Sequence, residues 1–354
     1  MRSRLNAAIA AVRTADESLR APGQAHLDNR TKPRGSLGRL EDIALRMHMA
    51  RREAPRADPM RIYTVAGDHG VVAEGVSLFP QEVTRQMVLN FLNGGAGINA
   101  LCAATNIQLK VVDAGSCGGG YPEHADLIQR KVAPGTANFA HGPAMSEEQC
   151  LAALCLGLDL AEECAKDGIR AVGTGDMGIG NTTPSTALYC AFLGFSAAQV
   201  TGPGTGLDAA AMARKAEVID RALKVNAEAL GKGPLAVLAA LGGYEIATLA
   251  GLILGCAAKG ITVAVDGFIS TAAYVAAREL CPAVADHAFL SHASAEPGHR
   301  LICEKLGERP LFDLGMRLGE GTGAAIALHV IRCACAMWND MASFAEAGVS
   351  EGAS

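Results

Sequence analysis

A single acid near the C-terminus stands among glycines. Glu320 lies in the segment Gly319-Glu320-Gly321-Thr322-Gly323, directly before the apolar run of residues 324–338. Glycine permits backbone geometry and close ligand approach that a Cβ would block, so this segment is typical of a loop that holds a ligand beside a carboxylate. Glu320 is therefore a candidate catalytic group. The alternative is an acid in the first helical turn that complements the helix dipole.

Three further loops offer small residues and free backbone N–H groups, which suit a phosphate. They are residues 173–184, 201–208 and 291–298. The second loop precedes a helical stretch that carries Arg214 and Lys215, and Lys215 would add a point charge for a phosphomonoester. Each loop can equally be a plain connection, and the Arg-Lys pair can be a solvated surface pair.

The pattern Gly173-x-Gly175-x-x-Gly178 matches the fingerprint of dinucleotide-binding loops in form. A full fingerprint also needs an acid about 20 residues further on to hold the ribose. Residues 189–201 contain no acid, and the first one is Asp208. A nicotinamide-dependent dehydrogenase therefore stays a second hypothesis, and a non-catalytic nucleotide sensor is a third.

Residues 66–87 mix polar groups with apolar side chains, as a pocket for a flat aromatic ligand needs. The segment contains the pair Asp68-His69, which invites a catalytic interpretation. No nucleophile is visible nearby. We therefore expect Asp68 and His69 to order this loop.

Composition and charge indicate a globular chain. The 354 residues are enough for one large domain or two unequal ones, and 50% of them are hydrophobic against 19% charged. Forty-one glycines with only 4% aromatic residues favour an α/β enzyme over a helical bundle. The net charge of −5, with scattered lysines and arginines, provides no basic surface for nucleic acid.

The cysteines and histidines suggest neither disulfides nor a metal site. Eleven cysteines are an odd number without paired metal spacing, which favours a reduced, cytoplasmic chain. The nine histidines show no zinc-ligand spacing. We expect no metal and no cofactor, and we expect His287, His292 and His299 in loops or on the surface.

Membrane association and ATP hydrolysis are not predicted. The first 17 residues include Arg13, Asp16 and Glu17 and lack the apolar core of a signal peptide. The most apolar internal stretch, residues 246–258, is too short to span a bilayer. The chain has no Gly-x-x-x-x-Gly-Lys-Ser/Thr loop, and no adjacent acids precede a threonine-rich phosphate loop of the kind that holds phosphoribosyl pyrophosphate through magnesium.

The elements that must position these loops follow a strand-loop-helix repeat. Short apolar runs typical of buried strands occur at residues 62–65, 109–112, 169–172, 261–265 and 288–290, and most end in a glycine or an aspartate. This repeat predicts an α/β fold with a parallel, Rossmann-like sheet covered by helices. Ligands in such folds bind at the carboxyl ends of the strands, so the glycine-rich loops should converge there.

Helical patterns occupy both ends of the chain. Residues 2–57 are predicted to be helical, with a break at Lys32-Pro33-Arg34-Gly35, and residue 322 begins another helix. We predict an α/β catalytic domain at residues 58–322 and a smaller helical lobe made of residues 1–57 plus 323–354. Residues 311–312 would add a sixth strand.

Taken together, these segments resemble the nicotinate-nucleotide–dimethylbenzimidazole phosphoribosyltransferase family. The resemblance runs in order over some 300 residues, and its motifs include Gly67-Asp68-His69-Gly70 and Arg317-Leu318-Gly319-Glu320-Gly321-Thr322-Gly323. The remaining matching segments are residues 32–41, 80–84, 177–183, 204–208, 242–247, 266–268 and 294–296.

The resemblance implies a reaction and a role for the acid. Members of the family transfer 5-phosphoribosyl from nicotinate mononucleotide to 5,6-dimethylbenzimidazole, releasing nicotinate and α-ribazole 5′-phosphate for the lower ligand of cobalamin, as homodimers without metal. One benzimidazole nitrogen attacks the ribose C1′ while the other must lose its proton. A carboxylate can remove that proton as a general base. In the family this is the acid of the Gly-Glu-Gly-Thr-Gly motif, which is Glu320 here.

The same matching implies further site residues. The nucleotide and phosphate site would include Gly178, Lys215, Gly204, Gly206, Ser294, Leu318 and Gly319, and the base pocket would include Ser77, Phe79 and Gln86. Asp176 is a second candidate catalytic carboxylate. The family usually has a glutamate at that position, so the reach of Asp176 toward Glu320 or the ribose is one methylene shorter.

Overall fold

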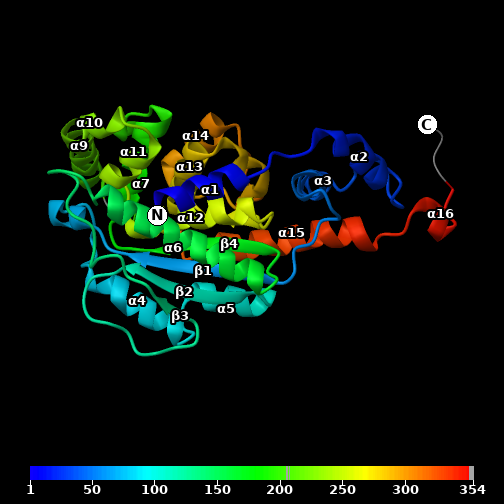
Figure 1. Cartoon of the computed structure of the whole chain (residues 1–354), viewed down its shortest axis with the longest axis horizontal. Coiled ribbons are helices and arrows are strands. Elements are labelled where there is room, and N and C mark those ends of the chain that lie inside the picture. The colour runs from blue at the N-terminus through cyan, green and yellow to red at the C-terminus, as the bar shows by residue number, and fades with distance from the viewer. Residues whose placement is uncertain (205, 207, 351–354) are drawn as a thin grey trace.

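A parallel sheet forms the centre of the molecule (Figure 1). The computed structural model describes residues 1–204, 206 and 208–350. Its six strands are all parallel and lie in the order β3-β2-β1-β4-β5-β6. Their bounds are β1 Met60–Gly67, β2 Gln108–Gly115, β3 Leu127–Gln129, β4 Ala171–Met177, β5 Thr262–Val265 and β6 Ala288–Leu290.

The strand order reverses between β1 and β4. From β1 the chain builds outward to β2 and β3, and then returns to the other side of β1 with β4, β5 and β6. Such a switch point opens a crevice at the carboxyl ends of the strands, where ligands of open α/β sheets bind. The predicted α/β fold with a parallel sheet is confirmed.

The five predicted strands are all present, but the predicted sixth is wrong. Phe312 forms only an isolated parallel bridge to His292 beside the β6 edge. The sixth strand is instead β3 at the opposite edge, where its three residues pair with β2. A strand this short has no alternation that a sequence pattern could reveal.

Helices cover both faces of the sheet. In chain order they are α1 Arg2–Ala11, α2 Arg20–Asp28, α3 Arg39–Arg51, α4 Glu82–Leu92, α5 Gly97–Thr105, α6 Glu147–Lys166, α7 Thr182–Leu193, α8 Ala197–Val200, α9 Ala209–Val225, α10 Ala227–Leu230, α11 Pro234–Leu241, α12 Tyr244–Ala258, α13 Phe268–Leu280, α14 Pro297–Leu306, α15 Thr322–Asp340 and α16 Phe344–Ala347. Short 3-10 turns are η1 Glu17–Leu19, η2 Gly70–Glu74 and η3 Pro282–His287.

Two hydrophobic cores lie on opposite faces of the sheet. The larger contains the inner faces of α6, α7, α11, α12 and α13, and the smaller lies among α3, α4, α5 and α15. Helix α12 is buried along almost its whole length. A Cβ on Gly157 or Gly251 would overlap the backbone of the opposite helix, so these glycines let α6 and α12 pack in direct contact. The apolar stretch at 246–258 is thus a core helix.

One segment of the described chain has the length and composition of a membrane-spanning helix. It is Glu82–Thr105, with a mean hydropathy of 1.3. A turn at residues 93–96 divides it into α4 and α5, of 11 and 9 residues. Each is shorter than the roughly 20 residues that a bilayer requires.

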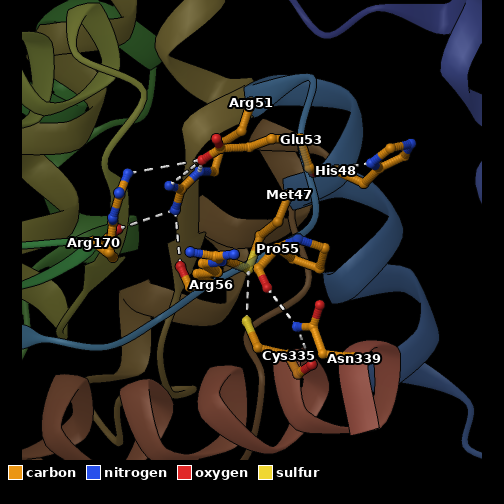
Figure 2. A network of polar contacts seen from close by, with 9 residues as sticks. All are labelled: Met47, His48, Arg51, Glu53, Pro55, Arg56, Arg170, Cys335 and Asn339. Carbon is orange, nitrogen blue, oxygen red and sulfur yellow. Dashed lines mark hydrogen bonds and ion pairs between the residues drawn. The ribbon is translucent and has the colours of Figure 1, made fainter. Parts of the chain in front are cut away.

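The helices α2, α3 and α16 lie beyond one end of the sheet, beside the C-terminal part of α15 (Figure 1). Figure 2 shows contacts of this region: Arg51 at the end of α3 donates to the Glu53 carboxylate and, at 3.5 Å, to the carbonyl of Arg170 next to β4. The Asn339 amide of α15 donates to the carbonyl of Pro55 at 2.8 Å. Helix α15 runs without interruption from the sheet into this region. The division into a domain at residues 58–322 and a smaller lobe stays a prediction. Residues 351–354 of that lobe lie outside the described residues.

Candidate active site

A cavity of about 410 Å³ opens at the switch point, at the carboxyl ends of β4 and β5. Loops that are far apart in the sequence meet there, together with one face of α4. The lining residues are Phe79, Val83, Met87, Asp176, Met177, Gly178, Ile179, Asn181, Thr182, Gly204, Gly267, Phe268, Ile269, His292, Ser294, Glu296, Arg317, Leu318, Gly319 and Glu320.

Most of the predicted site residues line this cavity. They are Glu320, Asp176, Gly178, Gly204, Ser294, Leu318, Gly319 and Phe79. Lys215 lies just behind the wall. Ser77, Gln86 and Gly206 lie outside the lining, and Gln86 points to solvent as an exposed residue of α4. Thr205 and Leu207, within the predicted loop 201–208, lie outside the described residues.

The Glu320 carboxylate is buried yet reaches the cavity. The residue is only 5% exposed, and its Oε2 accepts a hydrogen bond from the backbone N–H of Ile98 at 3.2 Å, in the first turn of α5. Burial raises the pKa of Glu320, the Ile98 N–H opposes this, and the nearby Asp266 raises the pKa further. A carboxylate with a raised pKa that is held by one oxygen can use the other as a general base.

Asp176 is a second acid of the cavity wall. It is buried at the end of β4, and its Oδ2 accepts from the Asn181 amide at 2.9 Å. Burial, followed by the proximity of Asp266, raises the pKa of Asp176 to about 8, although Asn181 opposes the shift. At neutral pH Asp176 is therefore mostly protonated, and it can donate a hydrogen bond rather than accept a proton.

A cationic corner lies at another part of the cavity wall. Lys215 of α9 is 1% exposed, and its Nζ donates to Thr182 Oγ1 at 2.6 Å. Burial lowers the pKa of Lys215 to about 8, against the effect of Glu296. Thr182 is also the first residue of α7, whose N-cap, Asn181, makes no side-chain capping bond. The Thr183 N–H already donates to the Gly180 carbonyl at 3.0 Å, and Pro184 has no N–H, so the Lys215 ammonium group is the group of this corner that suits a phosphate.

The Gly173-x-Gly175-x-x-Gly178 pattern does not form a dinucleotide loop. Gly173 and Gly175 lie inside β4, not in a turn between strand and helix. A Cβ on Gly175 would overlap the carbonyl of Glu320, so this glycine lets the loop that carries Glu320 lie directly against the strand. This geometry removes the basis of the dehydrogenase hypothesis.

Three histidines are expected in loops or on the surface, and a surface position is wrong for all three. His287, His292 and His299 are all buried, and His292 lines the cavity. Burial lowers the pKa of His299 to about 3, so its ring is neutral. Its Nδ1 accepts from the Ser294 N–H at 3.0 Å, and Thr271 Oγ1 lies 3.0 Å from its Nε2. His299 thus supports the loop that carries Ser294.

Asp68 and His69 have the loop-ordering contacts that the sequence predicts. Asp68 accepts from the Thr84 hydroxyl and from the N–H of Cys117, both at 2.7 Å. The buried His69 pairs with the buried Glu245 at 2.7 Å. In the part of the chain that the structure describes, no three His, Cys, Asp or Glu side chains gather as a metal-binding group.

Sequence reasoning missed the apolar wall that α4 contributes. Val83 and Met87 lie one helical turn apart and line the cavity together with Phe79. Their spacing of four residues, directly after the turn at Pro80, is a signal that could have revealed this wall. The burial of His292 has no comparable local signal.

Comparison with known proteins identifies the class of enzyme. The family model described as phosphoribosyltransferase matches residues 12–349. A fold with a crevice at its switch point, a cationic corner and a buried carboxylate agrees with this class, and the chain is a phosphoribosyltransferase.

The similar proteins specify the family. Enzymes of Nitratidesulfovibrio vulgaris and Solidesulfovibrio magneticus, named nicotinate-nucleotide–dimethylbenzimidazole phosphoribosyltransferase, are 61% and 62% identical, over 99% and 98% of this chain and 99% of each relative. The crystal structure of CobT from Thermus thermophilus superposes with a TM-score of 0.89 at 44% identity, covering 95% of this chain and all of that one. The chain belongs to the nicotinate-nucleotide–dimethylbenzimidazole phosphoribosyltransferase family, which confirms the resemblance seen in the sequence.

Proposed function

We propose that this enzyme transfers 5-phosphoribosyl from nicotinate mononucleotide to 5,6-dimethylbenzimidazole or a related base, giving nicotinate and α-ribazole 5′-phosphate for the lower ligand of cobalamin. The observation that carries the proposal is the cavity itself, which combines a cationic corner, an apolar wall and one buried carboxylate. Each part answers one chemical need of the transfer.

The donor phosphate occupies the corner formed by Lys215, Ser294 and the start of α7. The ammonium group of Lys215 neutralises and orients it. The pyridinium of the donor is already a cationic leaving group, so nicotinate departs without protonation of its ring nitrogen. The chemical demand on the protein therefore falls on the attacking base.

The acceptor base packs against Phe79, Val83 and Met87. Glu320 lines the same cavity as these three side chains. As one benzimidazole nitrogen bonds to C1′, Glu320 takes the proton from the other nitrogen, and the product leaves as a neutral azole. Asp176, protonated at neutral pH, does not share this role but can donate to the ribose or the base.

The direct test is to incubate the purified protein with nicotinate mononucleotide and 5,6-dimethylbenzimidazole without added metal. Chromatography with mass spectrometry should show nicotinate and α-ribazole 5′-phosphate forming in equal amounts. Tight binding of the nucleotide with no product from any benzimidazole would instead favour the nucleotide sensor.

A homodimer in the cytoplasm is part of the same proposal. Four large apolar side chains, Leu78, Phe79, Leu314 and Leu318, are each at least 47% exposed, and two of them, Phe79 and Leu318, line the cavity. Large apolar side chains exposed to this extent are candidates for a protein contact. All eleven cysteines are free, which supports a reducing compartment. Light scattering after size exclusion would measure the oligomeric state.

A further inference from the structure

The backbone of Glu320 adopts an unusual conformation. Among the described residues other than glycine, only Arg52, Asn106 and Glu320 have a positive φ. Arg52 and Asn106 end helices, where a left-handed residue is common. Glu320, with φ of 64°, instead precedes a helix between Gly319 and Gly321. A left-handed residue at a functional site persists only where its surroundings hold it.

One side chain from β1 holds the carbonyl of this residue. Thr64 is fully buried, and its Oγ1 donates to the backbone oxygen of Glu320 at 2.7 Å. Glu320 precedes the first residue of α15, Thr322, so no helical hydrogen bond engages its carbonyl oxygen. Among the described residues, Thr64 is the donor to that oxygen. Gly175 of β4 leaves the space that lets the carbonyl come so close to the sheet.

The next peptide units are held from β5. Asp266, at the end of that strand, accepts from the N–H of Gly321 at 3.1 Å and of Ala324 at 3.0 Å. Its own N–H donates to Thr174 Oγ1 at 3.1 Å. Groups on three neighbouring strands thus fix the peptide units on the C-terminal side of Glu320, and its side chain is directed toward Ile98.

We infer that Thr64 is a positioning residue for the transfer: its hydroxyl holds Glu320 in the left-handed conformation that presents the carboxylate to the acceptor base. The inference rests on the proposed role of Glu320 as the general base. Thr64 does not line the cavity and contacts no substrate, so it acts only through Glu320.

The test compares two substitutions of similar size. Thr64→Val keeps the shape and removes the donor, and it should lower kcat about 10²-fold, the effect of a misplaced catalytic group. KM for nicotinate mononucleotide should change by no more than about twofold, since the phosphate corner is untouched. Thr64→Ser keeps the donor and should retain most of kcat. If the methyl group mattered instead, the order of the two variants would reverse.

A double-mutant cycle with Glu320→Gln separates this inference from the proposed function. If Thr64 acts through the carboxylate, adding Thr64→Val to Glu320→Gln causes little further loss. An undiminished further loss, or normal turnover of Thr64→Val beside an inactive Glu320→Gln, overturns the inference and leaves the proposed base intact. Full activity of Glu320→Gln overturns the base itself.

A second buried threonine provides the control for effects on folding. Thr248 of α12 is fully buried, and its hydroxyl has no partner in the described structure. Thr248→Val should keep normal kcat. If Thr64→Val does not fold, Thr64→Ala and Thr64→Ser differ by one hydroxyl and provide the same comparison, with thermal unfolding of each measured beside its kinetics.

Discussion

A cavity lies at the carboxyl ends of the strands, here called the carboxyl edge, and a groove lies at their amino ends, here called the amino edge. The two regions differ in whether their buried polar atoms have hydrogen-bond partners. At the carboxyl edge, Glu245 Oε2, Glu296 Oε2 and His292 Nδ1 are buried without a partner. At the amino edge, a groove of about 590 Å³ is lined by basic side chains, and none of its residues has such an atom. Each region also has one left-handed residue other than glycine, Glu320 at the cavity and Arg52 at the groove. Unpaired buried polar groups, more than volume or charge, therefore distinguish the candidate active site.

The amino-edge groove has structural partners for its charge. Arg51, with its side chain only 4% exposed, donates to the Glu53 carboxylate at 2.6 Å and to the carbonyl of Arg56 at 2.8 Å (Figure 2). Lys259 pairs with Glu162 at 3.1 Å. The last residues of α1, α3 and α12 also line the groove, and helix C-termini favour nearby cations. These basic side chains of the groove are therefore paired with nearby carboxylates, carbonyls and helix C-termini.

The largest expected effect is at the carboxyl edge. Glu320→Gln keeps an oxygen that can accept from the Ile98 N–H but cannot take a proton. We expect kcat for α-ribazole 5′-phosphate formation to fall about 10²- to 10⁴-fold, the usual contribution of a general base. Single-turnover kinetics would measure it, with the surface variant Glu304→Gln as control. Near-normal turnover by folded protein would contradict the role of Glu320.

The next effect concerns donor binding. Lys215→Met removes the buried ammonium group, and KM for nicotinate mononucleotide should rise about 10- to 100-fold, as expected for a lost hydrogen bond to a charged group. Arg214→Met removes the same charge from an exposed neighbour on α9 and should leave KM unchanged. Equal effects in the two variants would indicate general electrostatics instead of a phosphate site.

A pH effect on stability should distinguish Asp176 from ordinary acids. Its folded pKa of about 8 lies above the reference value of 3.8, so between these values the folded state binds the extra proton. The stability that this provides is present at low pH and is lost as pH rises through about 8. Asp176→Asn should therefore become more stable than the parent as pH rises. Thermal unfolding across that range, with Asp220→Asn as a surface control, measures this; a constant difference would contradict it.

The smallest effect is predicted for the amino edge. Glu53→Ala removes the carboxylate shared by Arg51 and Arg170. Because Glu53 is half exposed, the free energy of unfolding should fall by only about 1 kcal/mol. Both kcat and KM should stay at the parent values. Chemical denaturation and steady-state kinetics would show this, and a loss of turnover would mean that the two edges are coupled.

Much of the fold could be predicted because its signals are local. The five apolar runs each form a strand, and the glycines before residue 322 precede a helix as expected. The candidate site was predicted less completely. Glu320, Asp176 and Ser294 line the cavity, whereas Ser77 and Gln86 lie outside it and the wall of Val83 and Met87 was missed. Which face of α4 turns to the cavity depends on its packing against the sheet.

By itself the sequence determined the family, the parallel sheet and the loop of Glu320, because ordered motifs, apolar runs and glycines act at short range. Only the tertiary structure decided the chemical state of the groups that meet there. Burial raises the pKa of Asp176 and lowers the pKa of Lys215, and a threonine 256 positions away in the chain donates to the carbonyl of Glu320. Desolvation and contacts of this kind arise only when distant strands lie side by side.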